Sequence, residues 1–161
     1  MDIFVDSDGV IYNFDKLLKD NNIDNNSSKA VYNFLKVSSD FAFLEGEIIE
    51  ENLHLLDLVK EGKAKILTSL PNKYDFRNYF EEEKEYLEVY EKLKNNKYSF
   101  YEKLGIPRDS VIIVDTRNEK FKYCSSGSIL YDDFPKTVDK WNELGGEGHL
   151  VKNHLCSAQN N

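Results

Sequence analysis

Four short groups of polar residues stand out in the chain, because each follows a short apolar run. They are Asp6-Ser7-Asp8-Gly9, Thr68-Ser69, the lysines Lys120 and Lys122, and Asp132-Asp133. Carboxylate oxygens bind hard divalent cations, and hydroxyl and ammonium groups bind anions. If the fold gathers them in one place, these side chains predict a site for a cation together with an anionic ligand.

Asp6 and Asp8 lie two residues apart, so on an extended chain both side chains point to the same side. Two close carboxylates repel one another until a cation binds or the pKa of one of them rises. Asp132-Asp133 adds further negative charge, which favours a hard cation with oxygen ligands, Mg²⁺ above all. Gly9 permits a tight turn directly after the first pair.

Each group also has an interpretation without any chemistry. Asp8-Gly9 is a common turn signature, and Thr68-Ser69 is typical of a helix cap. The two lysines lie in a charged stretch typical of a solvated surface, and Asp132-Asp133 is also compatible with a helix start. The four groups follow successive predicted strands, however, and this repetition favours a site.

Short apolar runs predict the elements that position these groups. Strands are expected at 3–5, 64–67, 111–114 and 129–131, with a weaker one at 149–151. Helical patterns fall between them, at 48–61, 81–94, 99–104 and 135–144. This alternation predicts crossover connections and a parallel α/β sheet, with an α+β mixture as the alternative. Ligands of such sheets bind outside the carboxyl ends of the strands, where the four polar groups follow.

The segment 16–47 does not fit this alternation. It is polar over 20–29, contains a short helical piece at 31–35, and then has an aromatic cluster around Phe41 and Phe43. We therefore expect a small insertion after the first strand, within a single domain that covers all 161 residues.

Composition excludes several classes of protein. A hydrophobic content of 40% is enough for a buried core and excludes disorder over most of the chain. The formal charge of −8 argues against binding to duplex nucleic acid. No apolar run reaches the length of about 18 residues that a membrane span needs, and the first residues carry no secretory signal. With only two cysteines, Cys124 and Cys156, we expect a cytoplasmic protein.

In their order along the chain, the four groups resemble the motifs of the haloacid dehalogenase superfamily of phosphotransferases. The matching residues are Asp6-Ser7-Asp8-Gly9-Val10, Thr68-Ser69, Lys120 or Lys122, and Asp132-Asp133. The resemblance runs from residue 2 to about residue 151. It implies a three-layer, Rossmann-like parallel sheet with helices on both faces and a small helical cap inserted after the first strand.

Within that superfamily, the chain is most similar to the 5′(3′)-deoxyribonucleotidase group and its small phage and bacterial relatives. The similarity lies in the segments 8–14, 66–71, 116–117 and 129–135, followed by Trp141 and Gly145-Gly146. The implied activity is Mg²⁺-dependent hydrolysis of a phosphate monoester, with a (deoxy)nucleoside monophosphate as the expected substrate.

The resemblance assigns roles to the four acidic residues. Asp6 would be the nucleophile that forms an aspartyl-phosphate, and Asp8 would be the general acid and then the general base. Mg²⁺ would be held by Asp6, the backbone oxygen of Asp8 and one of the pair Asp132 and Asp133. Of that pair, we expect Asp133 to be the direct ligand and Asp132 its close neighbour.

The implied phosphate-binding residues are Thr68, Ser69 and one of two lysines. A lysine close to Thr116-Arg117 is Lys120, whereas an ungapped spacing to the acidic pair selects Lys122. We favour Lys120 and keep both as candidates.

Three aromatic residues match the positions at which the subgroup binds the base of its substrate, namely Phe14, Phe41 and Phe43. An aromatic face stacks on any nucleobase, which gives the match a physical basis. The alternative interpretation is that these side chains fill the core of the insertion.

Other functions use similar residues. A sugar phosphate or the 3′-phosphate end of a nucleic acid would keep the same chemistry, in a monomer or a homodimer. A non-catalytic nucleotide-binding module is a more remote alternative, as is a phosphoacceptor domain of the receiver type. In receiver domains the adjacent acidic pair follows the first strand, whereas here Asp132-Asp133 follows the fourth.

Overall fold

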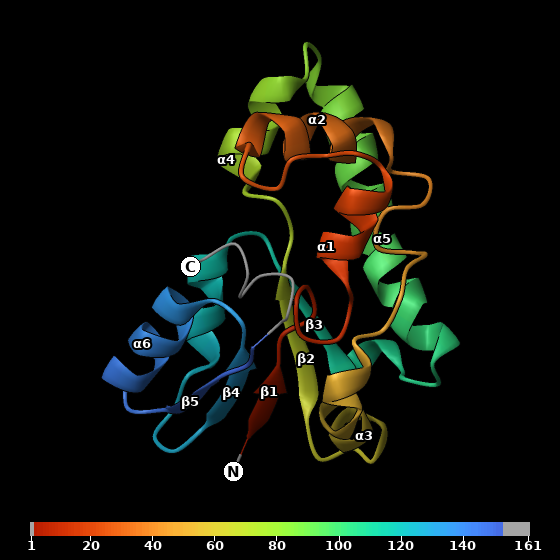
Figure 1. Ribbon diagram of the computed structural model, residues 1–161. Helices are drawn as coiled ribbons and strands as arrows, with labels where there is room; N and C mark the ends of the chain where they lie inside the picture. Colours follow the sequence, from red (N-terminus) through yellow and green to blue (C-terminus); the bar gives the residue numbers. More distant parts are fainter. Residues whose placement is uncertain (1, 153–161) are drawn as a thin grey trace.

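The computed structural model describes residues 2–152, so Cys156 lies outside the described part of the chain. It is an α/β structure around one five-stranded sheet (Figure 1). The elements are, in chain order, β1 (Ile3–Val5), α1 (Phe14–Asp20), α2 (Ser28–Val37), η1 (Glu50–Asn52), α3 (Leu53–Lys60), β2 (Lys65–Ser69), α4 (Lys73–Phe76), η2 (Arg77–Tyr79), α5 (Glu83–Lys103), η3 (Arg108–Ser110), β3 (Val111–Val114), η4 (Arg117–Tyr123), β4 (Ile129–Asp132), α6 (Pro135–Glu143) and β5 (Glu147–Leu150), where η marks a short 3₁₀ helix. Within residues 2–152, no helix is both long and apolar enough to cross a membrane.

All neighbouring strands of the sheet are parallel, in the order β3-β2-β1-β4-β5. The predicted parallel α/β architecture is therefore confirmed. β1 lies in the centre, between β2 and β4, so the loops after these three strands open at the same edge of the sheet. This is the edge at which parallel sheets bind their ligands.

Alternate residues of the strands enter two separate hydrophobic clusters, one on each face of the sheet. Val5 and Ile66 belong to the larger cluster, which contains buried residues of α3 and α5. Phe4 and Leu67 belong to the smaller cluster, which contains Trp141 of α6. Helices thus cover both faces, which explains why the strands read as continuous apolar runs rather than as alternating ones (Figure 1).

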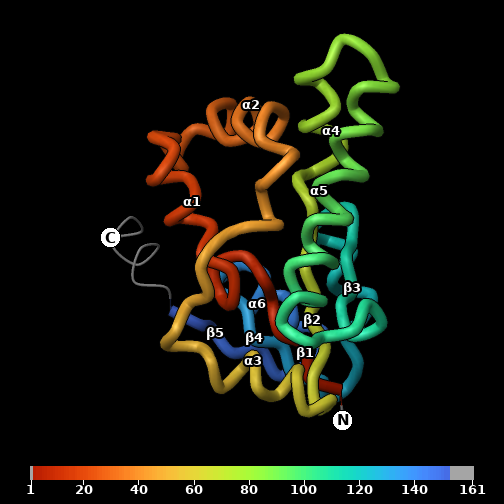
Figure 2. Tube along the Cα trace, turned by 90° about the vertical axis from the view of Figure 1, so that its right-hand side faces the viewer, coloured from red at the N-terminus to blue at the C-terminus, as the bar shows by residue number. Residues whose placement is uncertain are grey.

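Helices also cover the carboxyl edge of the sheet, and this cap comes from two chain segments (Figures 1 and 2). The segment after β1 supplies α1 and α2, and the segment after β2 supplies α4, η2 and the first part of α5. The ring of Tyr32 in α2 lies 5.7 Å from that of Phe76 and 5.4 Å from that of Tyr79. Lys36 Nζ donates a hydrogen bond of 2.7 Å to the carbonyl oxygen of Tyr79. The expected insertion at 16–47 therefore forms only one part of the cap.

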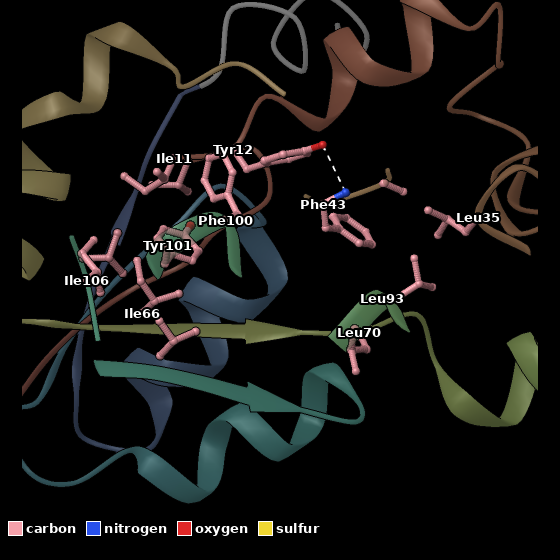
Figure 3. Packing of buried hydrophobic residues seen from close by; sticks show 14 of the residues in the cluster. Ile11, Tyr12, Leu35, Phe43, Ile66, Leu70, Leu93, Phe100, Tyr101 and Ile106 are labelled. Carbon is pink, nitrogen blue, oxygen red and sulfur yellow. Dashed lines mark hydrogen bonds between the residues drawn. The ribbon is translucent and has the colours of Figure 1, made fainter. Parts of the chain in front are cut away.

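One continuous core joins the cap to the sheet. It runs from Ile66 in the sheet through Tyr101 and Phe100 of α5 to Phe43 and Leu35 in the cap (Figure 3). Because these side chains are close-packed, the cap is held in a defined place above the strand ends.

Two helices differ from the sequence-based expectation. The expected helices at 81–94 and 99–104 are parts of one 21-residue helix, α5. The expected helix at 48–61 begins instead with the 3₁₀ turn Glu50–Asn52, before α3.

Candidate active site

The loop after β1 is a tight turn that carries the first two aspartates. Its centre is the carbonyl oxygen of Ser7, which accepts hydrogen bonds from the backbone N–H groups of the third, fourth and fifth following residues. Gly9 has a φ of +83°, in the left-handed region, and a Cβ at this position would lie 2.0 Å from Oδ2 of Asp133. Gly9 is therefore needed both for the turn and for the close approach of the loops after β1 and β4.

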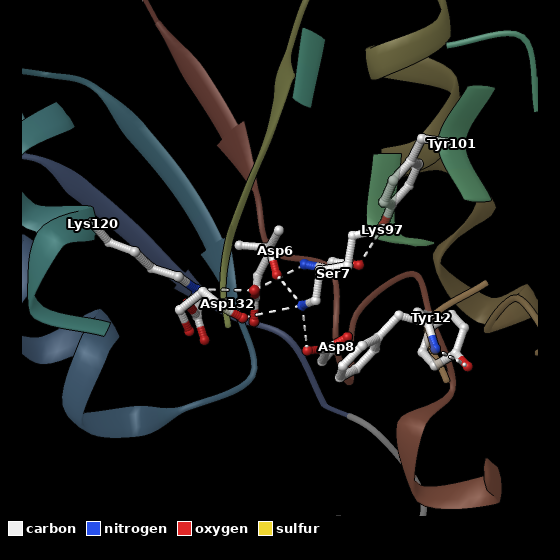
Figure 4. Close-up of polar contacts among 11 residues, drawn as sticks. Asp6, Ser7, Asp8, Tyr12, Lys97, Tyr101, Lys120 and Asp132 are labelled. Carbon is white, nitrogen blue, oxygen red and sulfur yellow. Dashed lines mark hydrogen bonds and ion pairs between the residues drawn. The ribbon is translucent and has the colours of Figure 1, made fainter. Parts of the chain in front are cut away.

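Lys120 joins two of the carboxylates (Figure 4). Its Nζ lies 2.9 Å from Oδ1 of Asp6 and 3.0 Å from Oδ2 of Asp132, and the residue is only 3% exposed. Burial lowers the pKa of Lys120, but the two carboxylates outweigh burial and raise it above its ordinary value. Lys120 is therefore a permanent cation within the site. Lys122, two residues further along η4, is exposed.

Three carboxyl groups converge beside this lysine. Asp6, Asp132 and Asp133 each offer one oxygen, and these oxygens lie within 4.8 Å of one another. Burial and then the charge of Asp6 raise the pKa of both Asp132 and Asp133. Because Lys120 supplies one positive charge against three carboxyl groups, a divalent cation would relieve the remaining repulsion. An all-oxygen donor set of this kind fits Mg²⁺.

Asp8 lies apart from this triad and pairs with a different lysine. Lys97 Nζ, from α5, lies 2.8 Å from Oδ2 of Asp8, 2.8 Å from Oγ1 of Thr68 and 3.0 Å from the carbonyl oxygen of Ser69. Burial raises the pKa of Asp8, and the charge of Lys97 opposes that shift. Both aspartates line the same pocket, as the spacing predicts, but they pair with different lysines because the chain turns at Ser7 rather than continuing as a strand.

The carboxylates and Lys120 open into a pocket of about 280 Å³ between the strand ends and the cap, whereas Lys97 is not part of its lining. Its lining includes most of the residues predicted from the sequence, namely Asp6, Asp8, Phe14, Phe43, Thr68, Ser69, Lys120, Asp132 and Asp133. Two predicted residues, Phe41 and Lys122, are not part of this lining.

The cap contributes an aromatic wall to the pocket. The rings of Phe14 and Phe43 are stacked, with centroids 5.4 Å apart and an interplanar angle of 23°. Phe41 instead packs edge-to-face on Phe34, with centroids 6.1 Å apart. Only two of the three predicted base-binding aromatics therefore face the cavity.

Two basic residues of the site were not among the predicted site residues. Lys97 is one, and its signal in the sequence is a lysine on the apolar stripe Leu93, Lys97, Phe100 of a helix. Arg117 is the other, since it lines the pocket with its guanidinium carbon 3.8 Å from the ring centre of Phe134. An arginine held over an aromatic ring is well placed to contact an anionic ligand.

The arrangement combines two carboxylates in different surroundings, a buried cation and a carboxylate triad in one pocket. Chemically, such a set can attack an electrophilic centre, neutralise an anion and protonate a leaving group.

No protein-family model, no curated protein and no solved structure matches the chain.

Proposed function

We propose that this protein hydrolyses phosphate monoesters with the help of Mg²⁺, through an aspartyl-phosphate on Asp6, and that its substrates are (deoxy)nucleoside monophosphates. The observation that carries the proposal is the separation of the two aspartates within one pocket. Asp6 lies with Lys120 and the carboxylate triad, whereas Asp8 lies with Lys97 and Thr68. Two carboxylates in different environments are suited to two different roles.

The charges of the site support phosphate as the ligand. A phosphate monoester is an anion, and it repels a carboxylate nucleophile unless positive charge surrounds it. Lys120 provides one such charge beside Asp6. Asp6, Asp132 and Asp133 would hold Mg²⁺, which when bound supplies further positive charge to the phosphoryl oxygens. Thr68 and Ser69, at the end of β2, face the same pocket and can donate to phosphoryl oxygens.

In the first step, a carboxylate oxygen of Asp6 attacks phosphorus while the bond from phosphorus to the leaving oxygen breaks. Asp8 donates its proton to that oxygen, so the leaving group departs as an alcohol. In the second step, Asp8 takes a proton from water as the water oxygen attacks phosphorus. The bond from phosphorus to Asp6 then breaks, which releases inorganic phosphate and restores both carboxyl groups.

The aromatic wall supports a nucleoside as the group that carries the phosphate. Phe14 and Phe43 belong to the cap and line the same pocket as the carboxylates. Any nucleobase can stack on an aromatic ring. Tyr32 and Leu35 continue this wall. A pocket that is lined both by groups able to bind a phosphate and by aromatic rings suits a nucleotide.

The test is the release of inorganic phosphate from nucleoside 5′- and 3′-monophosphates and from sugar phosphates, in Mg²⁺ and in EDTA. We expect release from nucleotides in Mg²⁺ and none in EDTA. Asp6→Asn should abolish turnover while the protein stays folded. Release from sugar phosphates alone would retain the chemistry and refute the nucleotide assignment, and no release from any of them would refute the phosphatase.

A further inference from the structure

Lys97 lies in the middle of α5 and is one of the most buried residues of the protein, with 2% of its surface exposed. Lysine is almost never buried to this extent unless its charge is paired. Here the ammonium group reaches the loop after β1 and the end of β2 at once (Figure 4).

The three protons of this ammonium group are all committed. It donates to Oδ2 of Asp8, to Oγ1 of Thr68 and to the carbonyl oxygen of Ser69, at 2.8, 2.8 and 3.0 Å. A lysine ammonium has three protons and no lone pair. The ring of Phe43, with its centre 4.4 Å from Nζ, lies against the same group. Lys97 therefore has no proton left with which to bind a substrate.

These contacts fix the orientation of the Asp8 carboxylate. Oδ2 is held by Lys97, whereas Oδ1 has no hydrogen-bond partner among the described residues. The carboxylate is also kept away from the triad of Asp6, Asp132 and Asp133, of which it is not a member. Because Oδ1 is also buried, the contact with Lys97 is what sets the direction of the carboxyl group.

The same contacts set the direction of the Thr68 hydroxyl. Because Thr68 Oγ1 accepts the hydrogen bond from Lys97, its own proton must be donated elsewhere. Thr68 lines the pocket, so a phosphoryl oxygen of the ligand is a suitable acceptor.

We propose that Lys97 is a positioning residue of the active site: it fixes the orientation of the Asp8 carboxyl group, from which the proton passes to the leaving oxygen, and it turns the Thr68 hydroxyl toward the phosphoryl group. This inference rests on the proposed phosphatase function. It differs from the role of Lys120, which pairs with the nucleophile Asp6 itself.

The test uses the dependence of the rate on the leaving group. A nucleoside 5′-monophosphate leaves as an alkoxide and needs the proton from Asp8, whereas 4-nitrophenyl phosphate leaves as a stable phenolate and does not. Because Asp8 also acts in the second step, which both substrates share, the comparison uses kcat/KM, which reports the step in which the leaving group departs. Lys97→Met should lower kcat/KM for the nucleotide by about 10²-fold or more, within the range of a lost general acid. The loss of kcat/KM for 4-nitrophenyl phosphate should be at least tenfold smaller (about 1.4 kcal/mol less).

Two further variants separate positioning from structure. Lys97→Arg keeps the charge and should recover part of the kcat/KM for the nucleotide. Lys92→Met removes an exposed lysine from the same helix, whose partner is Asp40, and should leave both rates unchanged. In an Asp8→Asn background, Lys97→Met should add little to the loss of kcat/KM, because the group that Lys97 positions no longer carries the proton.

Equal losses on the two substrates, or a change in KM alone, would overturn the role of Lys97. If thermal unfolding shows that Lys97→Met does not fold, Lys97→Gln and Lys97→Arg give the same comparison, and equal losses in them overturn the proposal too. Wild-type protein that releases phosphate from neither substrate would refute the proposed function, and with it this inference. An active wild type whose Lys97 variants show no dependence on the leaving group would refute the inference alone.

Discussion

Lys120 and Lys122 have the same side chain and lie two residues apart in η4, yet their surroundings are opposite. Lys120 is buried between Asp6 and Asp132, and Lys122 is exposed. Spacing in the sequence left both lysines as candidates. The connection between β3 and β4 is a 3₁₀ helix followed by a loop, and such a connection can place either lysine at the strand ends. The difference comes from which residue of η4 points at the strand ends.

This contrast predicts that Lys120→Met lowers kcat/KM by about 10²–10³-fold, the usual effect of losing one group that stabilises a developing anion. Lys122→Met should leave kcat/KM unchanged. Steady-state phosphate release measures both. The thermal stability of Lys120→Met should also fall more in EDTA than in Mg²⁺, because the cation can replace part of the missing charge. Equal activity of the two variants would exclude Lys120 from the catalytic site.

Gly9 gives a second prediction at this scale. Gly9→Ala and Gly62→Ala both place a Cβ at a left-handed backbone position, with φ of +83° and +75°, which costs about 1–2 kcal/mol of folding free energy. Only at Gly9 does the new Cβ meet another group, since it would lie 2.0 Å from Asp133, whereas nothing lies within 4 Å at Gly62.

We therefore expect Gly9→Ala to destabilise the protein more than Gly62→Ala in urea unfolding, and to weaken Mg²⁺ binding in a titration followed by thermal shift. Gly62→Ala serves as the matched control, and its Mg²⁺ affinity should equal that of the wild type. A Gly9→Ala variant with unchanged Mg²⁺ affinity would show that the loop after β1 does not position Asp133.

The aromatic residues of the cap make a prediction at the scale of an element. Phe14 begins α1 and lines the pocket, whereas Phe41 follows α2 and packs on Phe34. Loss of stacking on one base costs about 1–3 kcal/mol. Phe14→Leu should therefore raise KM for a nucleoside monophosphate about tenfold, and Phe41→Leu should not.

Ribose 5-phosphate, which has no base, is the control substrate for this pair. Its KM should be the same in the wild type and in Phe14→Leu. If Phe14→Leu raises both KM values equally, the aromatic wall supports the fold of the cap rather than the base of the substrate.

α5 shows why one element was predicted incompletely. The residues between the two expected helices, at 95–98, are mostly polar, and the distant partners of Asn96 and Lys97 could not be anticipated locally. Asn96 donates hydrogen bonds of 2.8 and 2.9 Å to the carbonyl oxygens of Ser39 and Ala42, and Lys97 pairs with Asp8. These partners lie 54–89 positions away along the chain, and the other two partners of Lys97, Thr68 and Ser69, lie 29 and 28 positions away. The helix is continuous because tertiary contacts satisfy polar groups that a local pattern assigns to solvent.

The strand ends were predicted well for the opposite reason. Each buried strand is a short apolar run, and the polar residue that ends it is local information. The arrangement of parallel strands then brings Asp6, Thr68 and Asp132 to one edge without any knowledge of long-range contacts. The second part of the cap was not predicted from the sequence, because α4 and η2 are held in place by long-range contacts such as that of Tyr32 with Phe76.

At the scale of the whole molecule, the carboxylate triad exists only when the protein is folded. Asp6 follows β1 and Asp132 ends β4, two strands that are neighbours in the sheet and far apart in the chain. The unfolded chain therefore has no such site, and any cation that binds the triad stabilises the folded state. The protein carries a net charge of −8, so nonspecific binding of cations must be separated from binding at this site.

Mg²⁺ at 100 times its dissociation constant should stabilise the wild type by about 2.7 kcal/mol. In a protein of this size that corresponds to a rise in Tm of roughly 5–11 °C. Asp133→Asn should raise Tm in EDTA, because it removes one of three repelling carboxylates, and should also reduce the rise that Mg²⁺ produces. These two effects have opposite signs, so a general loss of stability cannot imitate them. Asp139→Asn, which removes an exposed carboxylate from α6, should change neither, and an equal Mg²⁺ response in the two variants would place the cation elsewhere on the acidic surface.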